Sequence, residues 1–351
     1  MKKNLLGYPL SKLTEEFLGL GQSKFRAKQV FGWIYGKKVY DFDAMTDISK
    51  DFRGVLKDAY CIEFPKLYTR QDSTDGTVKV LLEMSDGAKV ESVLMPYNYG
   101  DAICVSSQVG CNMGCAFCAS GLLRKERNLT AAEMVGEVMV MNTILEPFGR
   151  RVTHIDVMGT GEPFDNYDNV MDFIRIMNDP FALAIGARHI TVSTCGLCDG
   201  ILKYGKEGLQ INLALSLHAP TDELRQQIMP IAKGYPFSKL IPALQEYSKD
   251  SGRRLTFEYI MLRDFNDTLE CAKLLESFIH DNNLFAYVNL IPYNEVKEKP
   301  FKRSDKNQVR LFASYLMNHG INCTVRKEFG GDIDAACGQL RSKQVKGEID
   351  G

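Results

Sequence analysis

The sequence lacks the apolar run that a membrane helix requires, because no stretch reaches roughly 18 to 20 uncharged apolar residues. A signal peptide is not expected either, since Lys2 and Lys3 are followed by only a few apolar residues before the polar Ser11 and Lys12. Charge of one sign is not in excess, with 43 Lys and Arg against 44 Asp and Glu in 351 residues, and there is no tandem repeat or low-complexity segment. These absences exclude fibrous and disordered classes. We therefore expect a cytoplasmic globular protein with no membrane partner.

Ten cysteines are present, and without a secretory context they cannot be assumed to form a disulfide framework. They must therefore be buried thiols, ligands of an inorganic centre or reactive thiols.

The chain divides into four predicted parts. Residues 1–70 are expected to form a small helical domain, because their apolar residues recur at helical spacing among Lys, Asp and Glu. Residues 71–97 are expected to form a β-hairpin leading into the core, because two β-branched runs flank an Asp-Gly turn. The core spans 98–342, and 343–351 is expected to be a frayed tail. The hairpin strands are expected at 77–84 and 89–95.

Within the core, short β-branched runs alternate with longer segments of helical periodicity. Six such alternations predict an α/β fold with a parallel sheet and outer helices, either a full or partial (β/α) barrel or an open sheet. In each case the functional residues should follow the carboxyl ends of the strands. The strands are expected at 103–107, 153–158, 189–194, 211–217, 255–261 and 286–291, and helices at 131–145, 168–177, 237–248 and 268–279.

A cluster of three cysteines follows the first of these strands. Cys111, Cys115 and Cys118 place three thiols within eight positions of one loop, next to Gly110 and Gly114. Zinc sites usually combine paired Cys-x2-Cys knuckles with a fourth ligand, and no second knuckle follows at finger spacing. A [4Fe-4S] cluster with three protein thiolates fits better, and it leaves one iron open to a small molecule. Zinc binding and purely structural thiols are the alternatives.

Polar or glycine-containing motifs follow the other strands. Taken singly, these residues are typical of turns, helix caps and satisfied core groups. Taken together, they would line one rim of the sheet, where they could contact a ligand. The candidates are Gly161 and Glu162 after the second strand, Ser193 after the third, Ser216, Leu217 and His218 after the fourth, and Asn294 after the sixth.

The C-terminal segment carries a further thiol, Cys337, between small residues. A cysteine on such a loop is open to attack, and the nearby Arg326, Lys327 and Arg341 could favour its thiolate. Spacing alone leaves both a structural and a catalytic cysteine open.

The Cys-x3-Cys-x2-Cys pattern, with aromatic Phe117 before the last cysteine, resembles the radical S-adenosylmethionine (SAM) superfamily. The resemblance implies a partial (β/α)6 barrel and a [4Fe-4S] cluster whose open iron binds SAM. Reduction of the cluster would then cleave SAM to a 5'-deoxyadenosyl radical. It also implies that Glu162 holds the amino group of SAM.

A narrower resemblance covers essentially the whole chain up to Leu340. The motifs at 106–111, 158–163, 216–220, 289–294 and 332–340 closely resemble those of the RlmN/Cfr family of RNA methyltransferases. This resemblance implies methylation of a non-nucleophilic adenine carbon, at C2 of adenosine-2503 in 23S rRNA and of adenosine-37 in certain tRNAs. It further implies that the N-terminal helical domain binds RNA and that the core ends in a catalytic loop.

The family mechanism assigns roles to three residues and uses two SAM molecules per turnover. By position, Cys337 would take a methyl group from one SAM and become S-methylcysteine, and the radical from the second SAM would remove a hydrogen from that methyl group. Glu91 matches the general base that takes the proton from the substituted carbon. Cys104 matches the thiol that resolves the RNA–protein crosslink and leaves a disulfide with Cys337.

RNA binding requires local positive charge, because the net charge is only −1. An external electron donor such as flavodoxin is implied by the radical chemistry. Five cysteines have no assigned role, although Cys195 and Cys198 form a Cys-x2-Cys pair that could be a weak metal site; the others are Cys61, Cys271 and Cys323. The candidate basic patches are 24–28 with 37–38, 124–127, 297–303, and 326–327 with 341–343.

Two alternatives stay open. A Cfr-type enzyme would methylate C8 of the same rRNA adenosine with the same cluster, Cys337 and Cys104. The run Val325–Asp332 resembles the C2 branch more closely. A non-catalytic RNA-binding or redox iron–sulfur protein would need neither SAM cleavage nor Cys337, but an electron carrier would be expected to complete its cluster with a fourth cysteine.

Overall fold

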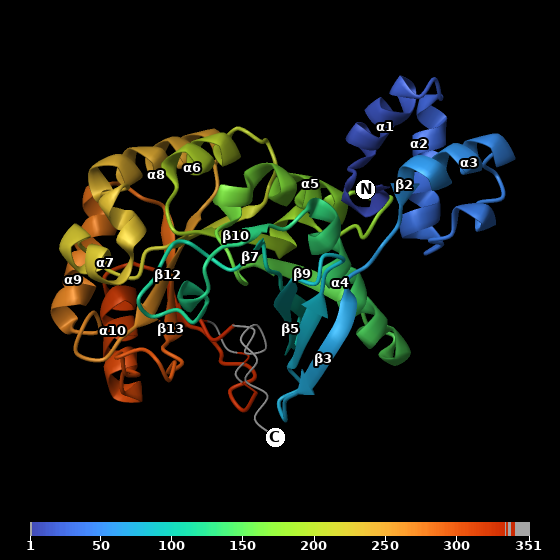
Figure 1. The fold of residues 1–351 in the computed structure, drawn as a ribbon. Helices are drawn as coiled ribbons and strands as arrows, with labels where there is room; N and C mark the ends of the chain where they lie inside the picture. The colour runs from blue at the N-terminus through green and yellow to red at the C-terminus, as the bar shows by residue number, and fades with distance from the viewer. Residues whose placement is uncertain (1, 334, 336–337, 341–351) are drawn as a thin grey trace.

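A computed structural model describes the whole chain except residues 1, 334, 336–337 and 341–351. Within this part of the chain, a ten-stranded mixed sheet runs in the order β14-β13-β12-β11-β10-β9-β6-β5-β4-β3 (Figure 1). The strands from β6 to β14 in this order are parallel. They are β6 (Gly100–Cys104), β9 (Val152–Val157), β10 (Ile190–Thr194), β11 (Asn212–Ser216), β12 (Leu255–Met261), β13 (Ala286–Pro292) and β14 (Cys323–Val325).

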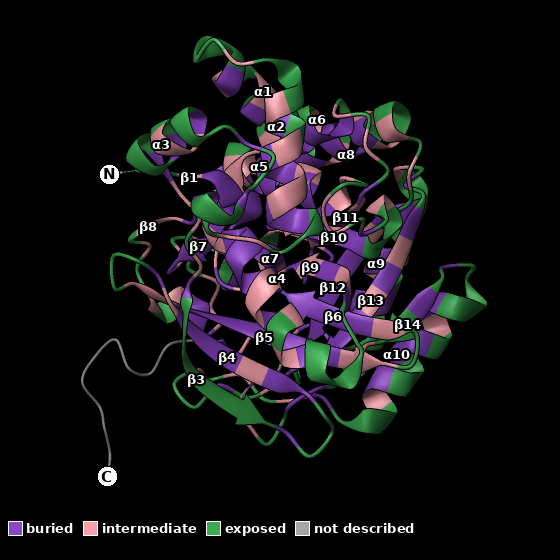
Figure 2. Ribbon diagram, turned by 90° about the vertical axis from the view of Figure 1, so that its right-hand side faces the viewer, coloured by how far each residue is buried: buried purple, intermediate pink, exposed green. Residues whose placement is uncertain are grey.

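Helices connect the parallel strands and cover the outer face of the sheet, while the strands are largely buried (Figure 2). The sheet does not close within the described residues, since β14 and β3 are its two edges. The predicted α/β fold with a partial barrel is therefore confirmed. The helices are α4 (Ala131–Leu145), α5 (Tyr167–Asn178), α6 (Cys198–Gly205), α7 (Asp222–Ile228), α8 (Phe237–Ser251), α9 (Leu269–Asp281) and α10 (Lys306–Asn318).

The predicted hairpin is also present, as β4 (Val78–Glu83) and β5 (Lys89–Tyr97). It does not stand apart from the core, because β5 pairs antiparallel with β6 and β4 pairs with β3 (Lys66–Asp72). The hairpin thereby extends the barrel sheet at one edge.

The N-terminal module contacts α4 and α5 through the short helical turn Leu5–Gly7 and through α1 (Leu10–Gly19). Gly7 lies so close to α4 that a Cβ atom there would be 2.8 Å from the backbone nitrogen of Ala132. Lys12 also pairs with Asp172 of α5 at 2.5 Å. The module consists of β1 (Lys3–Asn4), α1 (Leu10–Gly19), α2 (Lys24–Phe31), α3 (Lys50–Ala59) and β2 (Tyr60–Cys61).

After β14, the chain runs to β5 and β6. Phe329, Ala335 and Leu340 pack with Val93 and Cys104 in a small cluster of buried apolar residues. The C-terminal segment is thus brought to the carboxyl end of β6. None of the helices in the described part of the chain combines the length and apolar character needed to cross a membrane.

Candidate active site

The three clustered cysteines lie on one loop whose ends are held together by two short paired strands. β7 (Gln108–Val109) precedes the loop and β8 (Arg127–Asn128) follows it, in antiparallel pairing. The backbone N–H of Ala116, inside the loop, donates to the carbonyl of Ile228 at 2.8 Å. Because Ile228 ends α7, the loop is fixed to the barrel as well as to itself.

Gly110 is required by the closure of this loop. Its φ angle is +73°, and a Cβ atom at this position would lie 2.1 Å from the carbonyl oxygen of Arg124. The glycine therefore makes room for the returning chain.

All three thiols line one cavity at the carboxyl ends of the strands, together with Glu162 and His218. Burial raises the pKa of the Cys111 thiol to about 11 and also raises the pKa of Cys115. Thiols in such surroundings stay protonated unless a metal replaces the proton.

The donor set fits the predicted iron–sulfur cluster. Among the described residues, no three His, Cys, Asp or Glu side chains converge as the ligands of a single metal ion would. A cubane cluster takes its thiolates on separate irons, so its ligands stand further apart than those of one ion. Three soft donors that line one cavity suit this arrangement.

Glu162 lies in the same cavity with its carboxylate held from three sides. Its Oε1 accepts hydrogen bonds from the backbone N–H of Phe164 at 3.1 Å and the hydroxyl of Thr194 at 2.7 Å, and its Oε2 accepts from the N–H of Cys195 at 2.8 Å. Burial raises the pKa of Glu162, while these donors oppose the shift. A cationic group in the cavity would complete the environment of this carboxylate.

The glycines that precede Glu162 allow the loop after β9 to lie close to the loop after β6. A Cβ atom at Gly161, whose φ angle is +116°, would lie 2.6 Å from the Ser107 hydroxyl oxygen. At Gly159 it would lie 2.7 Å from the Ser106 hydroxyl oxygen. Gly159 and Gly161 also line the cavity, so the close approach of the two loops shapes its wall.

Ser193 and Ser216 face each other across neighbouring strands, with their hydroxyl oxygens 3.3 Å apart, and both line this cavity. Leu217 does not join them. It is fully buried and is not among the residues that line the cavity, and its N–H donates to the Glu258 carbonyl at 3.1 Å.

His218 lines the cavity as a neutral imidazole. Its Nδ1 accepts a hydrogen bond from the N–H of Ile260 at 3.1 Å, which leaves the proton on Nε2. Burial, and then the positive charge of Arg225, lower its pKa to about 3. His218 can donate a hydrogen bond but cannot supply positive charge near neutral pH.

Arg225 of α7 is a site residue that the sequence pattern did not reveal. It is fully buried, and its guanidinium donates to the carbonyls of Leu217 at 3.2 Å and Cys195 at 2.6 Å. It thereby ties α7 to the loops after β10 and β11. An arginine in a short polar helix gives no sequence signal of this role.

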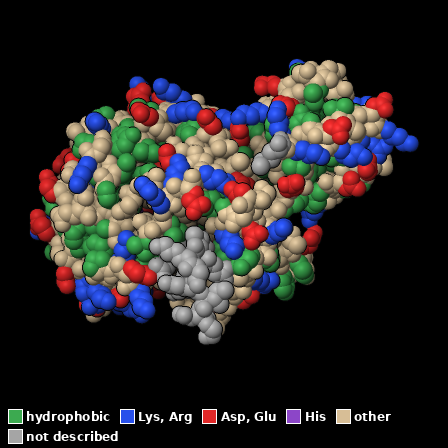
Figure 3. Space-filling view, viewed as in Figure 1, with side chains coloured by type: hydrophobic (Ala, Val, Ile, Leu, Met, Phe, Trp, Pro, Cys, Tyr) green, Lys and Arg blue, Asp and Glu red, His purple; other side chains and the backbone are tan. Residues whose placement is uncertain are grey.

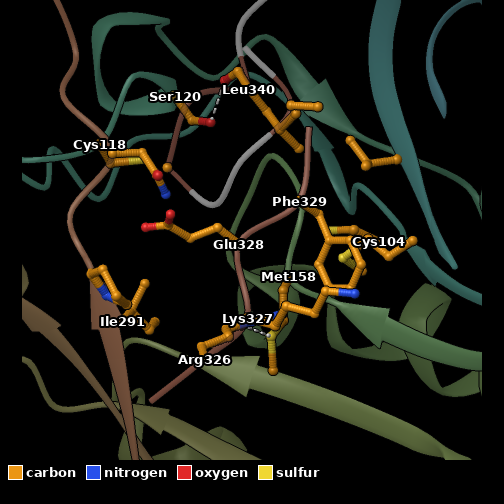
Figure 4. A pocket seen from close by; sticks show the side chains of 17 residues that line it. Cys104, Cys118, Ser120, Met158, Ile291, Arg326, Lys327, Glu328, Phe329 and Leu340 are labelled. Atoms are coloured by element: carbon orange, nitrogen blue, oxygen red, sulfur yellow. Dashed lines mark hydrogen bonds between the residues drawn. The ribbon is translucent and has the colours of Figure 1, made fainter. Parts of the chain in front are cut away.

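A second cavity adjoins the first. Cys104, at the end of β6, and Cys118, on the cluster loop, lie on opposite walls in Figure 4. Asn294 lines this cavity and not the one containing Glu162. Both cavities share Cys118, Ser120, Met158, Gly159, Ile291, Arg326 and Gly338.

Cys337 lies outside the described residues. The nearest described residues before and after it, Ala335 and Gly338, both line the cavity that contains Cys104. The backbone N–H of Ala119 donates to the Gly338 carbonyl at 2.8 Å, which connects the C-terminal segment directly to the cluster loop.

Glu91 lies on β5 with its side chain buried. It occupies the same face of the strand as Val93, which lines the cavity with Cys104. Its Oε1 is 3.5 Å from the Nζ of Lys79 on β4, and its carbonyl accepts from the Ser106 hydroxyl at 2.8 Å. Glu91 itself does not line either cavity.

A layer of charged groups crosses the barrel interior below the first cavity. Arg326, directly after β14, lies 3.7 Å from Glu258 of β12 and 3.9 Å from Asp156 of β9. Asn289 of β13 donates to both carboxylate oxygens of Glu258, at 3.0 and 3.1 Å. Burial raises the pKa of both carboxyl groups, while Arg326 lowers it. Sequence reasoning did not find this network, since its members lie on different strands.

Carboxylates compensate much of the predicted basic surface, and Figure 3 shows the two charges interspersed. Lys125 pairs with Asp165 at 2.6 Å, and Arg127 pairs with both Asp86 and Glu133. The patch beside the cluster loop is therefore less basic than its sequence indicates.

No disulfide joins any two of the nine described cysteines. The pairing of Cys104 with Cys337, implied by the family mechanism, is not supported by the described cysteines, because Cys337 lies outside the described residues. Cys195 and Cys198 are buried, and the Cys198 thiol contacts the Gly196 carbonyl at 3.7 Å.

Comparison with known proteins gives matches along the whole chain. A family described as the ribosomal RNA large subunit methyltransferase N-terminal domain matches residues 3–62, and the radical SAM superfamily matches residues 105–275. A probable dual-specificity RNA methyltransferase RlmN of Spiroplasma citri is 51% identical over 340 residues, which cover 97% of each chain. One of Streptococcus equi subsp. zooepidemicus (strain H70) is 49% identical over 349 residues, 99% of this chain and 97% of the relative.

The crystal structure of a radical SAM methyltransferase from Sphaerobacter thermophilus is similar over 97% of this chain and 99% of that one. The two share 40% identity, with a TM-score of 0.89.

Proposed function

Because this chain belongs to the RlmN family of dual-specificity radical SAM RNA methyltransferases, we propose that it methylates C2 of adenosine-2503 in 23S rRNA and of adenosine-37 in tRNAs. The observation that carries the proposal is the pair of adjoining cavities. One contains the three clustered thiols and Glu162. The other contains Cys104 together with Ala335 and Gly338, the nearest described residues before and after Cys337.

Cys111, Cys115 and Cys118 hold the [4Fe-4S] cluster. When bound, this cluster and SAM supply a radical by reductive cleavage, with an external electron donor such as flavodoxin. Glu162 binds the ammonium group of SAM, since its buried carboxylate needs a cation. Ser193, Ser216 and the Nε2–H of His218 line the rest of this cavity as hydrogen-bonding groups, with Gly161 in its wall.

Cys337 carries the methyl group that is transferred, so each turnover consumes two SAM molecules. Adenine C2 is not nucleophilic, and carbon bond formation there requires a radical on the methyl group carried by Cys337. Glu91 takes the proton from the substituted carbon. Cys104 then attacks the Cys337 sulfur and forms an S–S bond with it, while the bond between that sulfur and the transferred carbon breaks and this carbon takes up a proton to become the methyl group.

The remaining assignments follow from this function. Residues 1–70 bind RNA, 71–97 form the hairpin, and 98–342 form the catalytic core, followed by the tail at 343–351. Asn294, at the wall of the second cavity, hydrogen-bonds a polar edge of the ligand there. The enzyme acts in the cytoplasm, where both RNA substrates occur.

Mass spectrometry of the anaerobically reconstituted protein tests the proposal. Incubation with SAM, a reductant and an rRNA fragment should give S-methylated Cys337 and 2-methyladenosine in the RNA. 8-Methyladenosine would instead assign the chain to the Cfr-type reaction. Unmodified Cys337 without SAM cleavage, despite an intact cluster, would overturn the proposal and favour a redox or binding protein.

The role of Cys104 has a test of its own. Cys104→Ala should stop turnover after RNA attack and accumulate a covalent RNA–protein species attached at Cys337, visible as a retarded band on a denaturing gel. Cys271→Ala in α9 is the matched control, because Cys271 is also buried but lines neither cavity. Equal crosslink yields in Cys104→Ala and Cys271→Ala would show that Cys104 does not resolve the RNA–protein crosslink.

A further inference from the structure

The opposite end of the barrel contains a cavity that the proposed reaction does not use. It has a volume of about 760 Å³, within the range of small-ligand sites. Its walls come from the residues that precede or begin β10 to β13 and from the turn between β5 and β6. We call it the lower mouth, defined by Tyr97, Tyr99, Arg188, Thr191, Gln210, Asn212, Arg253, Arg254, Thr256, Phe285, Tyr287 and Thr324.

A layer of side chains separates the lower mouth from the cavity of the clustered thiols. The two cavities share only Met158, Glu258 and Arg326. Arg326 contacts Glu258, and one of its guanidinium nitrogens lies 3.7 Å from the Met158 sulfur. A ligand in the lower mouth would therefore not occupy the proposed SAM site.

The rim of the lower mouth is positively charged without compensation. Arg188, Arg253 and Arg254 have no carboxylate within ion-pair distance among the residues that the structure describes, whereas seven of the other thirteen described arginines have one. The only carboxylates that line the cavity, Asp156 and Glu258, lie deep in it and face Arg326. Guanidinium groups clustered in this way favour phosphate, which they bind through paired hydrogen bonds.

Neighbouring side chains position the guanidinium groups of Arg253 and Arg254 and contact the backbone of Arg188. The Arg253 guanidinium donates to the side-chain oxygens of Asn212 and Gln210, the latter at 3.3 Å. Arg254 lies over the ring of Tyr287, 4.5 Å from its centroid. Asn212 in turn donates to the carbonyl of Arg188 at 2.9 Å. The three cations are therefore parts of one connected surface.

Aromatic rings form the other side of the lower mouth. Tyr97 and Tyr99 stack with their centroids 4.7 Å apart, and Tyr99 contacts His154, which stacks on His189 at 4.2 Å. The Tyr99 side chain is nevertheless 61% exposed. Exposed rings beside guanidinium groups are the combination that binds nucleobases and their phosphates.

We propose that the lower mouth binds a nucleotide, with the base stacked against Tyr99 and the phosphate held by Arg188 and Arg254. The strand starts of a barrel ordinarily serve stability, which does not require uncompensated arginines around an open cavity. The nucleotide comes either from the RNA strand that the enzyme holds or from the free pool, and the chemistry of recognition is the same for both.

Binding measurements on the cluster-loaded full chain test this site. Saturating SAM is present throughout, so that the adenosine pocket of the proposed cofactor site is filled. The probes are adenosine 5'-monophosphate, followed by calorimetry, and an unstructured 12-nucleotide RNA, followed by fluorescence anisotropy. We expect Arg188→Ala/Arg254→Ala to weaken binding by about tenfold or more. Lys306→Ala/Arg310→Ala, which removes two exposed cations of α10, should leave it unchanged.

The aromatic side has a separate matched pair. Tyr99→Leu should weaken the same probe by about tenfold through lost stacking. Phe148→Leu removes a similarly exposed ring, at 69% exposure, away from the lower mouth and should have no effect.

The two probes identify the source of the nucleotide. A loss confined to the 12-nucleotide RNA, with a higher KM for substrate RNA at unchanged kcat, assigns the site to the RNA strand. A loss confined to adenosine 5'-monophosphate assigns it to a free nucleotide. The proposal would be overturned if Arg188→Ala/Arg254→Ala and Tyr99→Leu bound both probes as tightly as the control variants do. Because the affinities for the two probes are measured without turnover, absence of methylation would contradict the proposed function and leave this inference standing.

Discussion

At the scale of single residues, the Glu162 carboxylate is both buried and hydrogen-bonded, and these two features have opposite effects on its pKa. Burial alone disfavours its charge, whereas the donors from Phe164, Thr194 and Cys195 favour it. An ammonium group bound beside it would favour the ionised form further. Glu162 is thus suited to charge-assisted binding of a cationic ligand.

Glu162→Gln should weaken SAM binding by about 10- to 100-fold, because it removes one charge-assisted contact and retains a hydrogen-bonding side chain of the same size. Equilibrium dialysis of SAM against cluster-loaded protein measures the change. Glu15→Gln, on the exposed side of α1, is the matched control. Unchanged affinity at full iron content would show that Glu162 only caps the backbone around it.

Glu137 shows a second consequence of a buried carboxyl. It projects from α4 into the core, where Ser92 and the N–H of Ser106 donate to its Oε2 and no described group bonds its Oε1. Burial raises its pKa well above the ordinary 4.5. The folded protein therefore keeps the proton on Glu137 to a higher pH than the unfolded chain does. Its stabilising contribution is complete below pH 4.5 and is lost as the pH rises toward the folded pKa.

Glu137→Gln should remove this pH dependence, because glutamine keeps an acceptor for Ser92 and Ser106 but cannot ionise. Relative to the original protein, the variant should gain stability between pH 5 and pH 8, by at most about 1.4 kcal/mol per pH unit. Urea unfolding of the apoprotein at several pH values measures the difference. Glu15→Gln gives the baseline for loss of an exposed carboxylate. If the difference in unfolding free energy between Glu137→Gln and the original protein stays constant with pH, the raised pKa of Glu137 is contradicted.

At the scale of elements, a helix or strand could be predicted from the sequence where its local residue pattern agrees with the way it packs in the structure. The helix expected at 131–145 from its apolar periodicity is confirmed, and in the structure Thr130 and Glu133 begin it with a reciprocal capping box. The strand expected at 103–107 instead spans Gly100–Cys104, since the N–H of Ser106 bonds the Glu137 side chain from a distant helix. β3 was not predicted because all its residues are exposed, so it has no buried face to produce an alternating pattern.

The same reasoning separates site residues that sequence could indicate from those it could not. Local motifs after strand ends drew attention to Glu162, Ser193 and Ser216, which line one cavity. Leu217 belongs to the same motif, but strand alternation turns its side chain into the core. Arg225 depends on carbonyls of two distant loops, which no local pattern encodes.

The cluster loop offers a test at this scale. Gly110→Ala should lower iron content to below about half, because its Cβ would collide with the Arg124 carbonyl and displace the loop that carries the thiols. Gly149→Ala is the matched control, since Gly149 has a similar φ angle of +66° but open space around it. Iron analysis and the visible absorbance after reconstitution measure the effect. Equal iron content in the two variants would show that the loop can bind the cluster without this close contact.

At the scale of the whole molecule, two bodies of different character meet at α4. The described thiols and acids that are proposed to take part in the chemistry lie in the barrel and its extended sheet, and none of them lies in the N-terminal module. Its contact with the barrel depends on the close approach of Gly7 to Ala132 and on the ion pair of Lys12 with Asp172. If the module positions RNA over the barrel, a small displacement at this contact should affect RNA binding without affecting SAM chemistry.

Gly7→Ala makes that displacement, because the added Cβ would lie 2.8 Å from the Ala132 nitrogen and the module must shift to accommodate it. We expect KM for RNA to rise by a factor of about 3 to 10, the equivalent of roughly 1 kcal/mol. SAM cleavage in the absence of RNA should stay unchanged, since the cavity with Glu162 lies within the barrel. Gly54→Ala in α3 adds the same methyl group in open space and should alter neither quantity. If Gly7→Ala impairs RNA methylation and SAM cleavage to the same degree, the contact supports the barrel itself. If KM for RNA is unchanged, RNA binding does not depend on the placement of the module.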